Sequence, residues 1–202
     1  MNSAVIYKSY GPPPFSVKEA LRYAGCAKTD SELEALVEQC LSEVWDSLSY
    51  RVCYRLLPLE VEGELCRVGD TCFRSRALGA QLEGYSHVIV FAATVGAMLD
   101  RAIARYSRIA PSRALILQGI GAERAEALCD AFQADMEGEL GVSLGRRFSP
   151  GYGDLPLETQ RQVFELLGGC RSIGLSLNDS LLMSPSKSVT ALVGAGRRSG
   201  GA

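Results

Sequence analysis

The sequence predicts an α+β fold, a twisted antiparallel or mixed sheet with flanking helices. Three observations lead to this prediction. A helical pattern occupies most of the first fifty residues, short β-rich segments separated by turn residues follow, and helix and strand patterns alternate afterwards. With 202 residues the chain can bury a core without the help of a metal or disulfide bond.

The first section, residues 1–50, is predicted to be helical. Ser16 and Thr29 are each followed three residues later by a glutamate, the spacing of a capping box at a helix start. Gly25 should end the shorter first helix. The second helix has an apolar stripe made of Leu33, Leu36, Val37, Cys40, Leu41, Val44 and Leu48.

The pattern between residues 50 and 76 changes to short alternating segments. Pro58, Gly63 and Gly69 divide these segments, so we expect strands joined by turns. The apolar, β-branched run at 87–93 predicts a buried strand.

The exit of that strand, Ala-Thr-Val-Gly at 93–96, leads into a predicted helix. Its expected apolar face consists of Val95, Met98, Leu99, Ala102, Ile103 and Tyr106. A strand-turn-helix junction can present helix amides to an anion. An ordinary tight connection is the alternative that the sequence leaves open.

A further helix should begin at Pro111 and continue to about residue 136. Its apolar set is Ala125, Leu128, Cys129, Phe132 and Met136. We expect Gly119 and Gly121 to interrupt this helix, because each glycine costs about 1 kcal/mol relative to alanine. Close packing, a bend or a ligand would each account for them, and close packing is the simplest.

The last third is predicted to contain one helix and two strands. Pro156 can open a helix that ends at Gly168, and strands at 173–177 and 188–193 should flank a turn at Pro185. No apolar period follows, so we expect a main domain at 51–194 and a flexible tail at 195–202.

The segment 147–158 carries the clearest candidate binding chemistry. Pro150 and Gly151 break regular structure, so this part of the chain must form a shaped loop. Arg147 at its entrance offers a cation for a carboxylate, and Tyr152 between two glycines offers a flat surface beside free backbone groups. Such a loop suits a small zwitterion that carries an aromatic base.

The charge balance argues against a nucleic-acid partner. Lys and Arg total 21 against 23 acidic residues, which gives a net charge of −2. The apolar runs are well short of the roughly 20 residues that a membrane helix needs, and the N-terminus has no signal pattern. We therefore expect a cytoplasmic location.

The sequence has few residues from which a metal site or a hydrolase active site could be built. The seven cysteines contain no C-x-x-C pair, and His87 is the single histidine. A Ser-His-Asp triad could use only His87, which lies in a strand-like run where we expect a packed or hydrogen-bonded ring. The cysteines are expected to be mostly buried thiols.

The R-x-x-x-G-Y pattern of Arg147, Gly151 and Tyr152 resembles the activation domain of cobalamin-dependent methionine synthase. Pro-Ser-Lys-Ser-Val at 185–189 is similar to a later segment of that family, and Thr-Val-Gly at 94–96 with the helix at 123–136 is similar to its central helices. The resemblance covers about residues 85–194. The N-terminal section looks like that of short, free-standing versions.

The resemblance implies an accessory subunit that binds S-adenosylmethionine and supports reductive remethylation of a cobalamin. Arg147 would bind the methionine carboxylate, the backbone around Ser149 would meet the adenine, and Gly151 and Tyr152 would shape the groove. Glu126 would lie on the groove helix.

The cobalamin should come with a partner, because the D-x-H-x-x-G pattern that would bind it is absent from this chain. The partners implied are a cobalamin-dependent methionine synthase or a related corrinoid protein, and a flavodoxin-type electron donor. No self-contained set of catalytic residues is evident.

One departure from the family pattern keeps a second interpretation open. The fused domains have a tyrosine near the end of the Ser-Val segment, where this chain has Val193. The chain would then be an interaction module that docks on a corrinoid protein without S-adenosylmethionine. An independent small-molecule methyltransferase ranks below both, because the sequence has no evident general base and no glycine-rich Rossmann loop.

Overall fold

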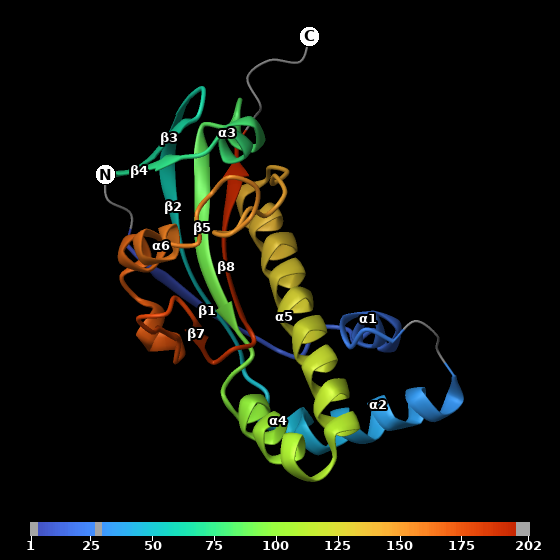
Figure 1. The fold of residues 1–202 in the computed structure, drawn as a ribbon. Helices are drawn as coiled ribbons and strands as arrows, with labels where there is room; N and C mark the ends of the chain where they lie inside the picture. The colour runs from blue at the N-terminus through green and yellow to red at the C-terminus, as the bar shows by residue number, and fades with distance from the viewer. Residues whose placement is uncertain (1–3, 27–29, 197–202) are drawn as a thin grey trace.

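A computed structural model describes residues 4–26 and 30–196 and shows a curled antiparallel sheet with helices on both faces (Figure 1). The six-stranded sheet has the order β4-β3-β2-β5-β8, and β1 pairs with β2. Its strands are β1 (Ile6–Tyr10), β2 (Tyr50–Glu62), β3 (Leu65–Val68), β4 (Thr71–Arg74), β5 (His87–Thr94) and β8 (Ser188–Ala195). The predicted α+β class with a twisted sheet is confirmed.

The long strand β2 organises the sheet. Residues 51–58 pair with β5, while the other edge of β2 pairs first with β1 and then with β3. The break predicted at Pro58 is wrong, because β2 continues through it. Pro58 pairs with His87 of β5, and the next residue begins the pairing with β3, so the proline lies where β2 changes partners. The predicted turns at Gly63 and Gly69 are confirmed, with φ of +61° and +57°.

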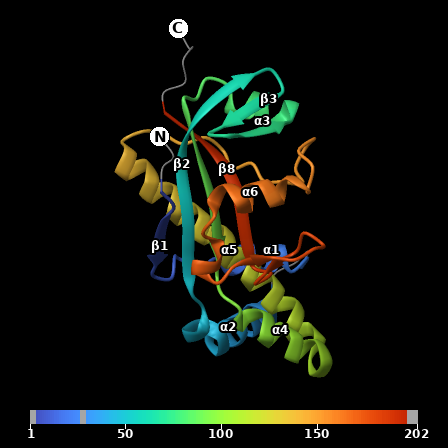
Figure 2. The same ribbon diagram turned by 90° about the vertical axis from the view of Figure 1, so that its left-hand side faces the viewer.

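The two faces of the sheet bury separate apolar clusters. Alternation along β5 sends Ile89 and Phe91 to one face, and Val88 and Val90 to the other. The first face is covered by α1 (Val17–Tyr23), α2 (Ser31–Val44), α4 (Met98–Ile109) and α5 (Pro111–Leu140). The second is covered by α3 (Arg76–Leu82), α6 (Thr159–Leu167) and the 3₁₀ turn Cys170–Ile173. In Figure 2 α6 lies in front of the strands and α5 behind them.

The N-terminal helices follow the predicted caps in part. The Ser16 side chain accepts a hydrogen bond from the Glu19 amide, and Gly25 follows the end of α1 with φ of +77°. Asp30 caps α2 by accepting from the Leu33 amide, and the predicted cap Thr29 lies outside the described residues. Both helices share one apolar cluster with α5. The strand β1 was not predicted. The boundary at residue 50 stays a prediction.

The helix α5 runs without a break through both glycines, so the predicted interruption is wrong. A Cβ at Gly119 would lie 2.2 Å from the Ala20 carbonyl oxygen, and one at Gly121 would lie 2.5 Å from Leu99 Cδ2. The glycines therefore allow α1 and α4 to approach the helix closely, which agrees with the close-packing explanation.

Gly119→Ala is expected to destabilise the protein by about 2–3 kcal/mol, because the new methyl group meets backbone that cannot swing away. Gly138→Ala in the same helix is the matched control, since a Cβ there meets nothing within 4 Å. That control should stabilise the protein by up to about 1 kcal/mol. Urea unfolding of both variants measures the difference, and equal effects would contradict the packing explanation.

Three boundaries near the C-terminus differ from prediction. The helix α6 begins at Thr159, because Pro156 lies in the preceding turn and accepts a hydrogen bond from the Thr159 amide. The predicted strand at 173–177 is reduced to β6 (Ser176–Leu177), which pairs with β7 (Met183–Ser184). The strand β8 extends to Ala195, and residues 197–202 of the predicted tail lie outside the described part.

The helix α4 begins at Met98, after the predicted junction at 93–96. Val95 precedes the helix, and the Met98 side chain is exposed, so neither belongs to its buried face. Asp100 in the first turn accepts hydrogen bonds from the amide and hydroxyl of Ser186. The first turn of α4 thus anchors the Pro185 turn. Across the described ranges, no helix has both the length and the apolar character needed to cross a membrane.

Candidate functional site

The loop after α5 is held against the edge of the sheet. Gly141 ends the helix in the left-handed conformation. The Gly145 amide then donates to the Gly194 carbonyl at 2.9 Å, and Phe148 and Leu192 exchange backbone hydrogen bonds of 3.0 and 2.8 Å. This pairing with β8 places Arg147 between the sheet edge and α5.

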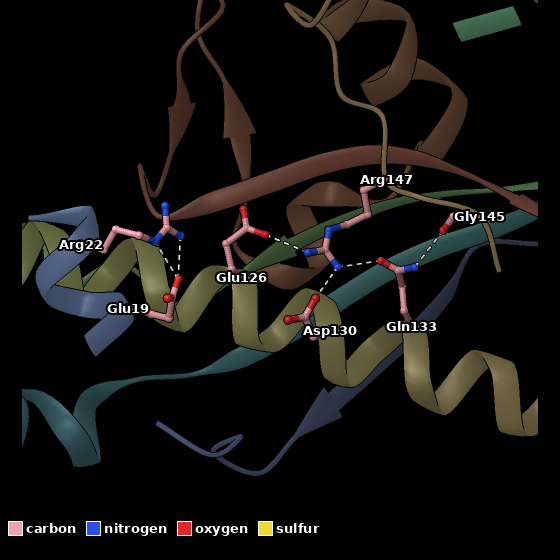
Figure 3. Close-up of polar contacts among 7 residues, drawn as sticks. All are labelled: Glu19, Arg22, Glu126, Asp130, Gln133, Gly145 and Arg147. Atoms are coloured by element: carbon pink, nitrogen blue, oxygen red, sulfur yellow. Dashed lines mark hydrogen bonds and ion pairs between the residues drawn. The ribbon is translucent and has the colours of Figure 1, made fainter. Parts of the chain in front are cut away.

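The Arg147 side chain reaches α5 and binds three of its side chains (Figure 3). Its Nη1 donates to Asp130 Oδ1 and to Gln133 Oε1, both at 2.6 Å, and its Nη2 donates to Glu126 Oε2 at 2.8 Å. Burial acts to lower the pKa of Arg147, but the Asp130 hydrogen bond and the neighbouring negative charges raise it above its ordinary value. The guanidinium is therefore a fixed cation between two carboxylates.

The bend of the loop depends on its glycines. Gly151 and Gly153 have φ of +89° and +55°, which side chains other than glycine rarely adopt. The Gly151 amide donates to the Leu155 carbonyl, and the Tyr152 amide donates to the Ser149 carbonyl. Tyr152 is 66% exposed at the tip.

Asp154 fixes the far side of the loop, a role that the sequence analysis missed. Its carboxylate accepts from the Ser75 hydroxyl at 2.5 Å and from the amides of Arg76 and Ala77 at 2.8 and 3.1 Å. These amides begin α3, so Asp154 ties the loop to a helix about eighty residues earlier. A serine before a helix is a local pattern that predicts an N-cap at Ser75. Its contact with Asp154 is not predictable in this way, because the two residues are far apart in the sequence.

Hydrogen bonds from Ser75 and from the Ala77 and Arg76 amides lower the pKa of Asp154 from 3.8 to about 2. A lowered folded-state pKa stabilises the protein above the unfolded pKa, and this stabilisation is lost as pH falls through the folded value. Between about pH 4 and 2, the free energy of unfolding should therefore fall less with pH in Asp154→Asn than in the wild type. Thermal unfolding across this range measures the effect, with Asp70→Asn at an exposed turn as control. If the unfolding temperatures of wild type and Asp154→Asn fall equally with pH, the stabilising role of the Asp154 carboxylate is contradicted.

Two cavities of about 220 and 350 Å³ adjoin each other beside the loop. They have four lining residues in common: Glu126, Ser149, Tyr152 and Val189. Arg147 lines the larger cavity and Gln160 the smaller. We call the whole the Tyr152 groove.

Four predicted site residues, Arg147, Ser149, Tyr152 and Glu126, thus meet in the Tyr152 groove, while Gly151 shapes the bend. Two other cavities, of about 340 and 370 Å³, lie beside α3 and α6 and are lined by none of these residues. Cavity volume therefore does not distinguish the Tyr152 groove from the other cavities. We choose it as the candidate site because the predicted residues converge there.

The first residues of β8 form the opposite wall of the groove. Ser188, Val189 and Thr190 line it, whereas Val193 is fully buried and pairs with Ile89 inside the sheet. The position that departs from the family pattern therefore lies in the core. Lys187 is half-buried against Gly121, and burial lowers its pKa.

The remaining candidate residues lie apart from the groove lining. His87 is exposed at the start of β5, with its Nδ1 3.0 Å from the Ser86 hydroxyl. All seven cysteines are free thiols, of which five are buried, Cys26 is partly exposed and Cys72 is exposed.

Comparison with solved structures gives a neighbour over nearly the whole chain. The crystal structure of the MetH reactivation domain bound to AdoHcy is similar over 99% of this chain and 80% of that one, with a TM-score of 0.70 and 14% sequence identity. The chain has the fold of the MetH reactivation domain. No family model matches the sequence, and no curated protein matches it. The likeness to the reactivation domain therefore lies in the fold.

Proposed function

We propose that this chain binds S-adenosylmethionine in the Tyr152 groove and presents its methyl group to a cobalamin held by a separate methionine synthase or related corrinoid protein. The observation that carries the proposal is the convergence of Arg147, Glu126, Ser149 and Tyr152 on one groove. The reactivation-domain fold, seen with AdoHcy in the neighbour, supports it.

The charges around Arg147 suit a zwitterion. The methionine carboxylate would pair with the guanidinium, and the α-ammonium would pair with Glu126 or Asp130, which now bind Arg147. A ligand that brings one charge of each sign can exchange these partners without leaving any charge unpaired. A ligand with the carboxylate alone would leave an acidic side chain without its cation.

The other end of the groove suits the adenosyl group. Pro150, Leu157 and Val189 give the smaller cavity an apolar part, and Ser149 lines the same cavity. Tyr152 at the rim is exposed. These residues would bind and orient the ligand, and the partner's cobalamin would supply the cobalt that accepts the methyl group. The electron for this reductive step would come from a separate donor of the flavodoxin type.

Isothermal titration calorimetry tests the ligand directly. We expect saturable binding of S-adenosylmethionine and of S-adenosylhomocysteine to the isolated chain, with tighter binding beside a cobalamin-loaded methionine synthase. No heat of binding in either setting would exclude the S-adenosylmethionine proposal.

A second function, docking on a corrinoid protein without S-adenosylmethionine, is favoured by one observation. The Arg147 guanidinium already has hydrogen-bond partners in Asp130, Gln133 and Glu126, so its charge is paired without a ligand. A pull-down of a corrinoid protein that succeeds equally with wild type and Arg147→Ala, without ligand, would support docking alone.

A further inference from the structure

Gln160 in α6 has a buried amide that is only partly satisfied. The residue is 3% exposed, and its Oε1 accepts a hydrogen bond of 3.0 Å from the Thr190 hydroxyl of β8. Its Nε2 has no hydrogen-bond partner among the described residues. A buried N–H group without an acceptor is costly, so such a group in a native fold needs an explanation.

The position of Gln160 supplies one. It lines the smaller cavity of the Tyr152 groove together with Thr190. Five of the other lining residues are apolar, Pro150, Leu157, Leu181, Met183 and Val189, and four are polar, Glu126, Ser149, Tyr152 and Ser188. Gln160 adds to this mixed lining an amide donor that has no partner among the described residues, which matches a flat heteroaromatic ring that has a nitrogen acceptor at its edge.

We propose that Gln160 determines the base specificity of the groove, and that its Nε2 donates a hydrogen bond to a ring nitrogen of a bound purine nucleoside. Thr190 is a positioning residue, because its hydroxyl holds Oε1 and leaves Nε2 for the ligand. The proposal rests on the proposed function for the identity of the nucleoside. Gln160 would then recognise the base through its side chain, a role that the sequence did not predict.

The test uses S-adenosylhomocysteine and its 1-deaza, 3-deaza and 7-deaza analogues, in each of which a C–H replaces one ring nitrogen. Wild type should bind one of these analogues about tenfold more weakly than the parent, because that analogue leaves Nε2 without its acceptor. Gln160→Met, which keeps the length of the side chain but has no N–H, should bind the parent about tenfold more weakly and should no longer discriminate against that analogue.

The outcomes separate the two proposals. No binding of the parent compound by wild type overturns both. Binding of all four compounds with equal affinity by wild type overturns the role of Gln160 and leaves the proposed function standing. If Gln160→Met still binds one analogue more weakly than the parent compound, the role of Gln160 is also overturned. Thermal unfolding of the variant checks its fold, and if Gln160→Met does not fold, the analogue series with wild type alone still decides.

Discussion

Replacing Arg147 with alanine is expected to weaken S-adenosylmethionine binding about 10- to 150-fold. The estimate follows from about 1.5–3 kcal/mol for hydrogen bonds to a charged group. Arg147 has the position and charge to bind the carboxylate, and its side chain is only 22% exposed, so water screens the interaction weakly. Calorimetry with S-adenosylmethionine measures the loss.

The same change should leave the fold nearly intact. The side chains of Glu126 and Asp130 are 41% and 70% exposed, so the loss of these ion pairs should cost less than about 1 kcal/mol of unfolding free energy. Arg147→Lys should recover only part of the affinity, because an ammonium cannot reproduce the planar fork. Arg108→Ala on the exposed surface of α4 is the control. Equal affinity in Arg108→Ala and Arg147→Ala would exclude Arg147 as the carboxylate ligand.

The sequence predicted elements whose signals are local. The Ser16 cap, the turns at Gly63 and Gly69 and the apolar run of β5 each depend on neighbouring residues, and the structure has all of them. The break at Pro58 was wrong for a long-range reason. Whether a strand tolerates a proline depends on which partner strand lies beside it, and β2 changes partners there.

The interruption predicted for α5 failed in the same way. Helix propensity describes how much a glycine destabilises an isolated helix. In the fold, Gly119 and Gly121 are required because Ala20 and Leu99 leave no room for a side chain. In the candidate site the sequence predicted Arg147 and the loop glycines, since a cation and a break in regular structure are visible locally, and their part in binding stays a prediction. Asp154 and Gln160 were missed, because their partners Ser75 and Thr190 are distant in the chain.

Replacing Arg124 with methionine should have the largest effect on stability, a loss of about 3–5 kcal/mol. Arg124 is completely buried in α5, and its Nη1 and Nη2 donate to the carbonyls of Pro13 and Pro14 at 2.7 and 2.6 Å. It also pairs with Glu123, whose carboxylate accepts from the Ser16 amide at the start of α1. Methionine would leave two carbonyls unpaired and a buried carboxylate without its cation. Urea unfolding measures the loss.

Arg113→Met is the matched control, because Arg113 lies in the same helix and pairs with Glu43 where both side chains are partly exposed. It should cost less than about 1 kcal/mol. Adding Glu123→Leu to Arg124→Met should restore part of the stability, since it removes the unpaired charge. A loss below about 1 kcal/mol for Arg124→Met would mean that apolar packing alone holds the N-terminal segment. The expected loss would instead tie that segment to the helix that presents Glu126, so that residues before 50 stabilise one wall of the Tyr152 groove.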